Sequence, residues 1–212
     1  YYIKLYGKIS FEYNYDFWKK LLTSSLPVAL TMFITILYNN LSMFLLGIMR
    51  TDHENGIYFA AFRVMAFSLV PAGILQSAFI PQLSRSLTLE DRQRFTEKYV
   101  MFTILFGAIF TAGIFTFSDY ITGISFGIDY RESSFILKLL MVTGLLAFIN
   151  VSYSAPLLAW NYEKKIFWAI VAGGLVDVVL NFLLIPQYGA MGAAVAAICT
   201  EGTVLIGLSI IM

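Results

Sequence analysis

Residues 166–212 read IFWAIVAGGLVDVVLNFLLIPQYGAMGAAVAAICTEGTVLIGLSIIM, and this stretch decides the fold of the chain. It consists of two apolar runs, 166–185 and 190–212, joined by a short segment with Pro186 and Gly189. Proline disfavours a continuing helix and lacks a backbone donor, while glycine accepts the backbone angles of a reversal. At about 1.5 Å per residue, each run is long enough to cross a bilayer core of about 30 Å. The sequence therefore predicts a transmembrane helical hairpin with almost no loop.

Two acidic side chains interrupt these runs, Asp177 in the first and Glu201 in the second. Each lies about 16 Å inside its own run by helix rise, so an antiparallel hairpin brings both near the bilayer midplane. One interpretation is a cation- or proton-coupling site, or a polar wall of a transport cavity. The alternative is that the acids are protonated and make hydrogen bonds that hold the helices together.

The composition extends this interpretation to the whole chain. Of 212 residues, 59% are hydrophobic and 13% are charged, against about 25% charged in soluble domains. The apolar residues occur in long blocks, which is typical of an all-α, polytopic membrane protein. We expect residues 1–18 to form a cytoplasmic or interfacial linker and residues 19–212 to form one lobe of six transmembrane helices. The expected spans are about 21–48, 57–83, 99–117, 134–159, 166–185 and 190–212.

The distribution of lysine and arginine predicts the orientation of these spans. One side of the predicted topology carries Lys4, Lys8, Lys19, Lys20, Arg85, Arg92, Arg94, Lys98, Lys164 and Lys165, and the other carries Arg50, Arg131 and Lys138. Cytoplasmic loops are enriched in basic residues. Both chain ends are therefore expected in the cytoplasm. Because the chain begins at Tyr1 without a signal peptide, we also expect it to be part of a longer protein.

Further polar residues lie within the predicted spans. Arg63, Asn39, Asn40 and Asn181 fall in the outer half, where they could line an outward-facing cavity in which Arg63 holds a phosphate or another anionic headgroup. Arg63 could instead extend to the interface or pair with a carboxylate. Asn150 and Gln76 lie towards the cytoplasmic half. They would belong to the polar wall or make interhelical hydrogen bonds.

Several function classes find no support in the sequence. The net charge of +1 gives no electrostatic basis for binding nucleic acid. One cysteine and one histidine provide no metal-binding cluster and no Ser-His-Asp set. A glycine-rich phosphate loop is also missing. We therefore expect no enzyme activity, no catalytic residue, no metal and no cofactor.

The hairpin motif Asp177-x-x-x-Asn181-x-x-x-Ile185-Pro186-x-Tyr188-Gly189-x-x-Gly192, followed by Glu201, resembles the late hairpin of polysaccharide (O-antigen type) flippases. These belong to the multidrug/oligosaccharidyl-lipid/polysaccharide exporter superfamily. Residues 18–47 resemble the opening helix of a lobe in this family, and residues 56–85 resemble the helix that follows. The resemblance covers about residues 18–201.

The resemblance implies the second six-helix lobe of a two-lobe exporter in the inner membrane of a prokaryote. Such a protein moves a lipid-linked oligosaccharide, such as an O-antigen precursor of lipopolysaccharide, from the inner to the outer leaflet by alternating access. Its partners would be this substrate, membrane lipids and the missing first lobe. Family members use basic cavity residues for the pyrophosphate, and here only Arg63 is available. The alternatives are a drug/cation antiporter of the same architecture, a membrane-embedded glycosyl polymerase or lipid-modifying enzyme, and a purely structural subunit.

Overall fold

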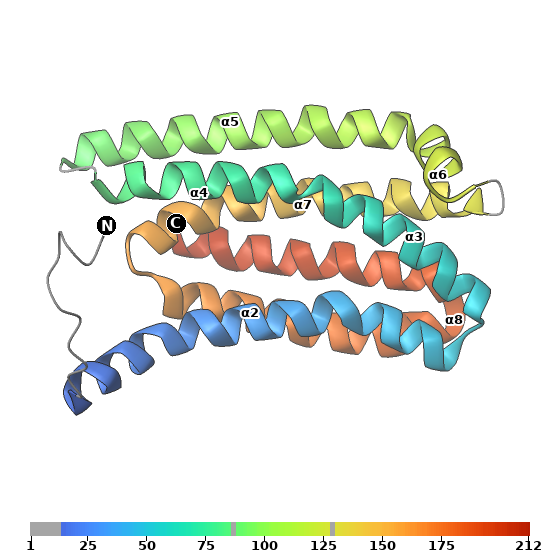
Figure 1. Cartoon of the computed structure of the whole chain (residues 1–212), viewed down its shortest axis with the longest axis horizontal. Coiled ribbons are helices and arrows are strands. Elements are labelled where there is room, and N and C mark those ends of the chain that lie inside the picture. The colour runs from blue at the N-terminus through green and yellow to red at the C-terminus, as the bar shows by residue number, and fades with distance from the viewer. Residues whose placement is uncertain (1–13, 86–87, 128–129) are drawn as a thin grey trace, which may run out of the picture.

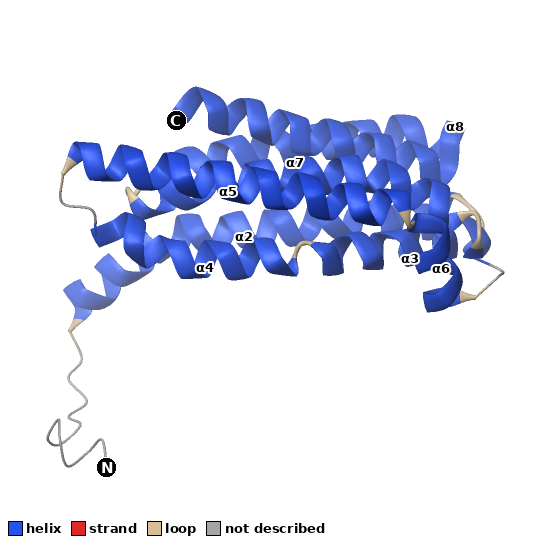
Figure 2. Ribbon diagram, turned by 90° about the horizontal axis from the view of Figure 1, so that it is seen from above, coloured by secondary structure: helices blue, strands red, loops and turns tan. Residues whose placement is uncertain are grey.

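A computed structural model describes residues 14–85, 88–127 and 130–212. Figures 1 and 2 show helices that run along a common long axis, and the described part of the chain contains no strand. The helices are α2 (Tyr15–Met49), α3 (Asp52–Ser68), α4 (Val70–Arg85), α5 (Leu89–Thr116), α6 (Ser118–Phe126), α7 (Ser133–Ala159) and α8 (Glu163–Ile211). The all-α class expected from the sequence is confirmed for these residues.

Five helical segments of the described chain are long and apolar enough to cross a membrane. They are 15–49, 52–85, 90–116, 133–159 and 163–211. The second joins α3 and α4, and the last is the 49-residue α8. The chain is thus a multi-pass helical membrane protein. The described residues contain five candidate spans and not the predicted six, because the two runs of the predicted hairpin both lie within α8.

Within α8 the backbone leaves helical geometry at Gly189, where φ is 55° and ψ is −132°. Glycine alone populates this region readily, because it has no Cβ. The two arms of α8 lie side by side in Figure 1, and side-chain packing confirms their contact. A Cβ on Gly173 would lie 2.5 Å from Val204, and one on Gly207 would lie 2.7 Å from Ala169. The predicted hairpin is therefore present, with a turn that needs only one non-helical residue.

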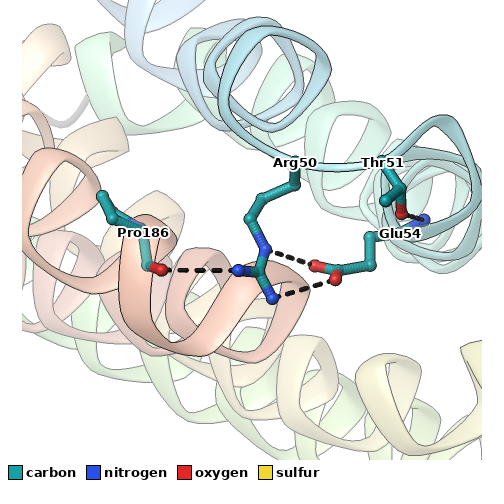
Figure 3. A network of polar contacts seen from close by, with 4 residues as sticks. All are labelled: Arg50, Thr51, Glu54 and Pro186. Carbon is teal, nitrogen blue, oxygen red and sulfur yellow. Dashed lines mark hydrogen bonds and ion pairs between the residues drawn. The ribbon is translucent and has the colours of Figure 1, made fainter.

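The turn of α8 contacts the corner between α2 and α3 (Figure 3). The guanidinium of Arg50 donates two hydrogen bonds of 2.9 Å to the Glu54 carboxylate and one of 3.4 Å to the Pro186 carbonyl. That carbonyl lies in the last turn of the first arm, where carbonyls lack helical donors. A Cβ on Gly189 would overlap Glu54. Close approach of the corner therefore requires glycine at this position.

The helix boundaries differ from the predicted loops and spans in three places. The predicted span 57–83 lies within the candidate span 52–85, but its helix is interrupted at Leu69 (Figure 2), because Pro71 has no N–H and restricts Val70 before it. Helix α5 begins at Leu89, ten residues before the predicted start, because the Thr88 hydroxyl caps the Asp91 amide. Part of the predicted loop 118–133 is the short helix α6.

The predicted linker lies only partly in the described region. Residues 1–13 are outside it, and α2 begins at Tyr15 with the Asn14 side chain accepting from the Phe17 amide. Residues 15–18 therefore belong to the first helix and not to a linker. The Asn14 cap gives the physical reason, since it satisfies one of the free donors at the helix start.

Helix α7 lies at the centre of the bundle and packs against α3, α4, α5, α6 and α8. Its buried side chains Leu137, Leu140 and Met141 share a core with Leu46 of α2 and Ile185 of α8. Helix α2 packs mainly on α8 and leaves much of its own surface exposed. The site described next lies where α2, α7 and α8 meet.

Candidate functional site

Seven polar side chains gather inside the apolar bundle, and we call them the polar cluster. They come from α2, α7 and both arms of α8: Tyr38, Ser42, Asn150, Asp177, Asn181, Thr200 and Glu201. Four hydrogen bonds between side chains of different helices or arms connect them. Polar groups in a hydrocarbon environment need such partners, since water is not there to satisfy them.

Asp177 is the most deeply enclosed acid of the described chain and is only 2% exposed. Its Oδ1 accepts a hydrogen bond of 3.0 Å from the Thr200 hydroxyl, which lies on the opposite arm of α8. The same hydroxyl also contacts the Ala196 carbonyl at 2.9 Å. The other carboxyl oxygen, Oδ2, is buried and has no hydrogen-bond partner among the described residues. Asp177 therefore joins the two arms through Oδ1, while Oδ2 could accept a hydrogen bond from a bound ligand or carry a proton.

One turn further along the first arm, Asn181 is fully buried. Its amide nitrogen donates to the Asp177 carbonyl at 2.9 Å, and its oxygen accepts from the Ser42 hydroxyl at 3.0 Å. The first bond stays within the helix and fixes the orientation of the amide. The second links the hairpin to α2, so Asn181 positions α2 against α8.

Glu201 lies on the second arm and joins three helices. Its two carboxylate oxygens accept hydrogen bonds from the Asn150 amide at 2.6 Å and from the Tyr38 hydroxyl at 3.3 Å. Asn150 also donates to the Glu201 carbonyl at 3.0 Å. The glutamate thus connects α7 to α2 across the hairpin. A helix that shifted relative to the others would break at least one of these bonds.

The polar cluster borders a small cavity whose lining also includes Asn39, Tyr58 and Thr143. The volume that a water molecule could occupy in it is about 20 Å³, and a single water needs about 10–15 Å³. The cavity therefore has room for about one water molecule or a small ion. An oligosaccharide does not fit there. Carboxylate, amide and hydroxyl oxygens around such a space are suited to a proton or a hard cation.

The structure separates the other predicted site residues from the cluster. Arg63 is exposed on α3, with its guanidinium carbon 4.7 Å from the centre of the Phe59 ring, and it does not line the cavity. Asn40 is exposed, and its amide donates to the Ile36 carbonyl of its own helix. Gln76 is half-buried on α4, outside the cavity lining. Asp177, Asn181, Glu201, Asn150 and Asn39 are brought together.

Three members of the cluster did not stand out in the sequence as site residues: Tyr38, Ser42 and Thr200. Hydroxyl side chains in a helix often bond their own backbone, so their presence in an apolar run is a weak signal. The available signal was position, because Thr200 precedes Glu201 and lies at the depth of Asp177 on the paired arm. Within residues 14–85, 88–127 and 130–212, no group of three or more His, Cys, Asp or Glu side chains could hold a metal.

Comparison with known proteins adds relatives at low identity. A protein named probable low-salt glycan biosynthesis flippase Agl15, from Haloferax volcanii, is 29% identical over 163 residues, which cover 75% of this chain and 34% of that protein. An uncharacterized membrane protein of Methanocaldococcus jannaschii is 27% identical over 196 residues, 91% of this chain and 46% of its own. The capsular polysaccharide biosynthesis protein CapF of Staphylococcus aureus is 22% identical over 213 residues, 97% of this chain and 53% of its own.

The chain therefore spans between 34% and 53% of the length of these relatives. No family model and no solved structure matches it. What the matches show is a likeness to membrane proteins, two of which are named for glycan or polysaccharide biosynthesis.

Proposed function

We propose that this chain is part of a flippase that moves a lipid-linked oligosaccharide from the inner to the outer leaflet by alternating access. The observation that carries the proposal is the polar cluster, which places two carboxyl groups inside an apolar helical bundle. Each charge at the centre of a membrane span costs about 2.5–3.5 kcal/mol on insertion scales, so such residues mark functional sites in most cases. The relatives named for glycan biosynthesis support the substrate class.

In this proposal the two arms of α8 cross the membrane separately. Together with α2, the pair α3–α4, α5 and α7, they make six crossings and one lobe of a two-lobe exporter. Figure 1 supports a common orientation of the basic segments, since the start of α2, the end of α4 and the starts of α5 and α8 lie at one end of the bundle. We place that end in the cytoplasm of a prokaryote, because it carries the excess of lysine and arginine.

The polar cluster would act as the coupling site rather than as the sugar site. A cavity with space for about one water suits a proton or a small cation. Binding there would change the hydrogen bonds that join α2, α7 and α8, and so would favour one arrangement of these helices. Arg63, which is exposed outside the cavity, would meet the anionic headgroup of the substrate together with Asn39 and Asn40.

Export of the glycan by the whole protein tests this proposal. In a strain that lacks the chromosomal gene, the full-length protein with Glu201→Gln is expected to reach the membrane but to export little sugar-lipid. Glu97→Gln, which neutralises an exposed acid on α5, serves as the matched control and is expected to export normally. Normal export by Glu201→Gln would remove the cluster from the mechanism. An inactive wild-type protein in the same assay would refute the flippase function.

A drug/cation antiporter is the second candidate, and one observation favours it. The cavity lining contains the carboxyl groups of Asp177 and Glu201 but not Arg63, and acids without a basic partner suit the small coupling cation of an antiporter. Extrusion of ethidium by the full-length protein, lost in Asp177→Asn and unaffected by Arg63→Ala, would support the antiporter. Glycan export that depends on Arg63 would support the flippase.

A further inference from the structure

A second hollow of the lobe lies on its outer surface, between α2 and the first arm of α8. It encloses about 350 Å³, which lies within the range of about 300–1,000 Å³ found for ligand sites. Apart from Tyr38 and Gly174, only aliphatic side chains line it: Ile34, Leu37, Leu41, Val171, Leu175 and Val178. We call it the α2–α8 groove.

Gly174 forms the narrow part of this groove. A Cβ at this position would lie 3.2 Å from Ile34 and 4.0 Å from the Tyr38 ring, so glycine lets α2 approach the hairpin closely. On either side of that contact, Leu37, Leu175 and Val178 are 54%, 64% and 40% exposed. The lining residues of α8 begin about 12 Å and end about 23 Å from Glu163 along the helix. The groove therefore lies at the depth of the hydrocarbon.

Tyr38 connects the groove with the polar cluster. Its ring lines the groove, its side chain also lines the small cavity, and its hydroxyl donates to Glu201. A molecule that filled the groove would therefore contact the residue that holds one oxygen of that carboxylate. The groove and the small cavity therefore meet at Tyr38, and a hydrocarbon chain in the groove would lie beside the polar cluster.

We infer that the α2–α8 groove holds the hydrocarbon chain of the lipid-linked substrate during its transfer. This inference rests on the proposed flippase function and names the part of the substrate that the groove binds. Lipid tails are as apolar as leucine, so a free membrane lipid gains little by entering. A chain tethered to a headgroup that the transporter already holds enters at a high effective concentration, which makes its binding selective.

Photolabelling of the full-length protein in phosphatidylcholine vesicles tests the inference. The probe is a polyprenyl phosphate that carries a diazirine in its chain, and labelled peptides are identified by mass spectrometry. We expect labels in residues 34–41 and 171–178. Unlabelled polyprenyl phosphate should compete, while phosphatidylglycerol at the same concentration should not. Equal competition by phosphatidylglycerol would overturn the inference, since any lipid would then occupy the groove.

Two neighbouring positions provide the variant and its control. Val178→Phe fills the groove, whereas Val179→Phe adds the same ring at a residue that is 56% exposed and does not line it. Val178→Phe is expected to lose most of the labelling, because the added ring occupies the space that the chain would fill. Val179→Phe should leave labelling unchanged. Equal labelling of both variants would overturn the inference.

The remaining outcomes separate this inference from the proposed function. If the wild-type protein exports glycan but neither segment is labelled, another part of the protein covers the groove and the inference fails alone. If the groove is labelled as expected but the wild-type protein exports no glycan, the flippase function fails and the groove remains a binding site for polyprenyl chains.

Discussion

Two seams of the same lobe are packed by different means. Where α2 meets α8, Ser42 bonds Asn181 and Tyr38 bonds Glu201, so the contact depends on polar side chains. Where α5 meets α7, the contact depends on shape. The Phe106 and Phe148 rings lie 6.2 Å apart, and a Cβ on Gly107 would lie 2.6 Å from Phe148. Both seams join membrane-spanning segments of one bundle.

The difference separates stability from function. An apolar seam in a bilayer is held by close packing, and it needs no polar group to form. The polar seam carries the additional cost of burying carboxyl and amide groups, which packing alone does not require. Changes on the α5–α7 side should therefore affect stability, while changes on the α2–α8 side should affect export. Three predictions test this division and a fourth concerns α6, and they run from the largest expected effect to the smallest.

Removal of the Asp177 carboxyl should have the largest effect. Asp177→Leu removes the carboxyl group that accepts from the Thr200 hydroxyl, which keeps only its bond to the Ala196 carbonyl. A hydrogen bond to a charged group is worth about 1.5–3 kcal/mol. Export by the full-length protein should fall about tenfold or more. The comparison on α5 is Thr103→Val, which replaces a fully buried hydroxyl by a methyl group outside the polar cluster. Its export should be normal, and a loss there would contradict the division.

Gly107→Ala should destabilise the lobe, because the added Cβ meets the Phe148 ring. Overpacking of this kind costs about 1–3 kcal/mol, and thermal unfolding in detergent micelles measures it. Gly113→Ala on the same helix is the control, since no atom lies within 4 Å of its Cβ position. Export per folded molecule should be unchanged in both variants. Equal melting temperatures would show that the α5–α7 contact is looser than described.

Tyr38→Phe removes one hydroxyl from the polar seam and keeps the ring. The lost hydrogen bond to Glu201 is worth about 0.5–1.5 kcal/mol, so export should fall a few-fold while polyprenyl labelling of the groove persists. Tyr99→Phe is the counterpart on the other seam, where the hydroxyl donates to the Val151 carbonyl at 3.4 Å. It should lower stability slightly without changing export. Reduced export by Tyr99→Phe together with normal export by Tyr38→Phe would contradict the division between the two seams.

The smallest effect concerns Asp119 of α6, outside the spans. Its pKa is lowered from the usual 3.8, first because the Ser134 hydroxyl donates to the carboxylate and then because Lys138 lies 3.0 Å away. A lowered pKa in the folded protein means that the stabilisation is complete well above pH 3.8 and is lost as the pH falls below it. Hydrogen exchange of residues 118–126 should therefore accelerate on acidification, and Asp119→Asn should remove this dependence. Asp119 is exposed and Lys138 is half-buried, so solvent screens the pair and the effect is small.

The sequence allowed the hairpin and the similar depth of its two acids to be predicted, because both follow from distances along the chain. Equal depth in two antiparallel runs places Asp177 beside the second arm, and the structure has Thr200 and Asp177 in contact. The partners on α2 and α7 could not be predicted in the same way. Which side chains of two separate helices meet depends on the rotation of each helix about its own axis. A membrane helix is apolar on nearly all sides, so its sequence does not specify that rotation.

Two boundary errors had local signals in the sequence. The pattern Thr88-x-x-Asp91 is an N-cap signal, and in the structure the Thr88 hydroxyl accepts from the Asp91 amide at 3.1 Å and donates to the Asp91 carboxylate at 2.6 Å. Counting charges alone assigned that segment to a loop. Pro71 likewise marked the break at Leu69, but the apolar run around it favoured a continuous span. The exposure of Arg63 had no such signal, since the direction of a side chain depends on neighbouring helices.

The single non-helical residue of the α8 turn also determines which residues of the two arms face each other. Because only Gly189 leaves helical geometry, the axial position of the second arm relative to the first is fixed at the turn. Insertion of one residue there would rotate the second arm by about 100° relative to the first. Thr200 and Glu201 would then face away from Asp177 and Tyr38. The length of this turn therefore sets the position of Asp177 relative to Glu201, which lie twelve residues before and twelve residues after Gly189.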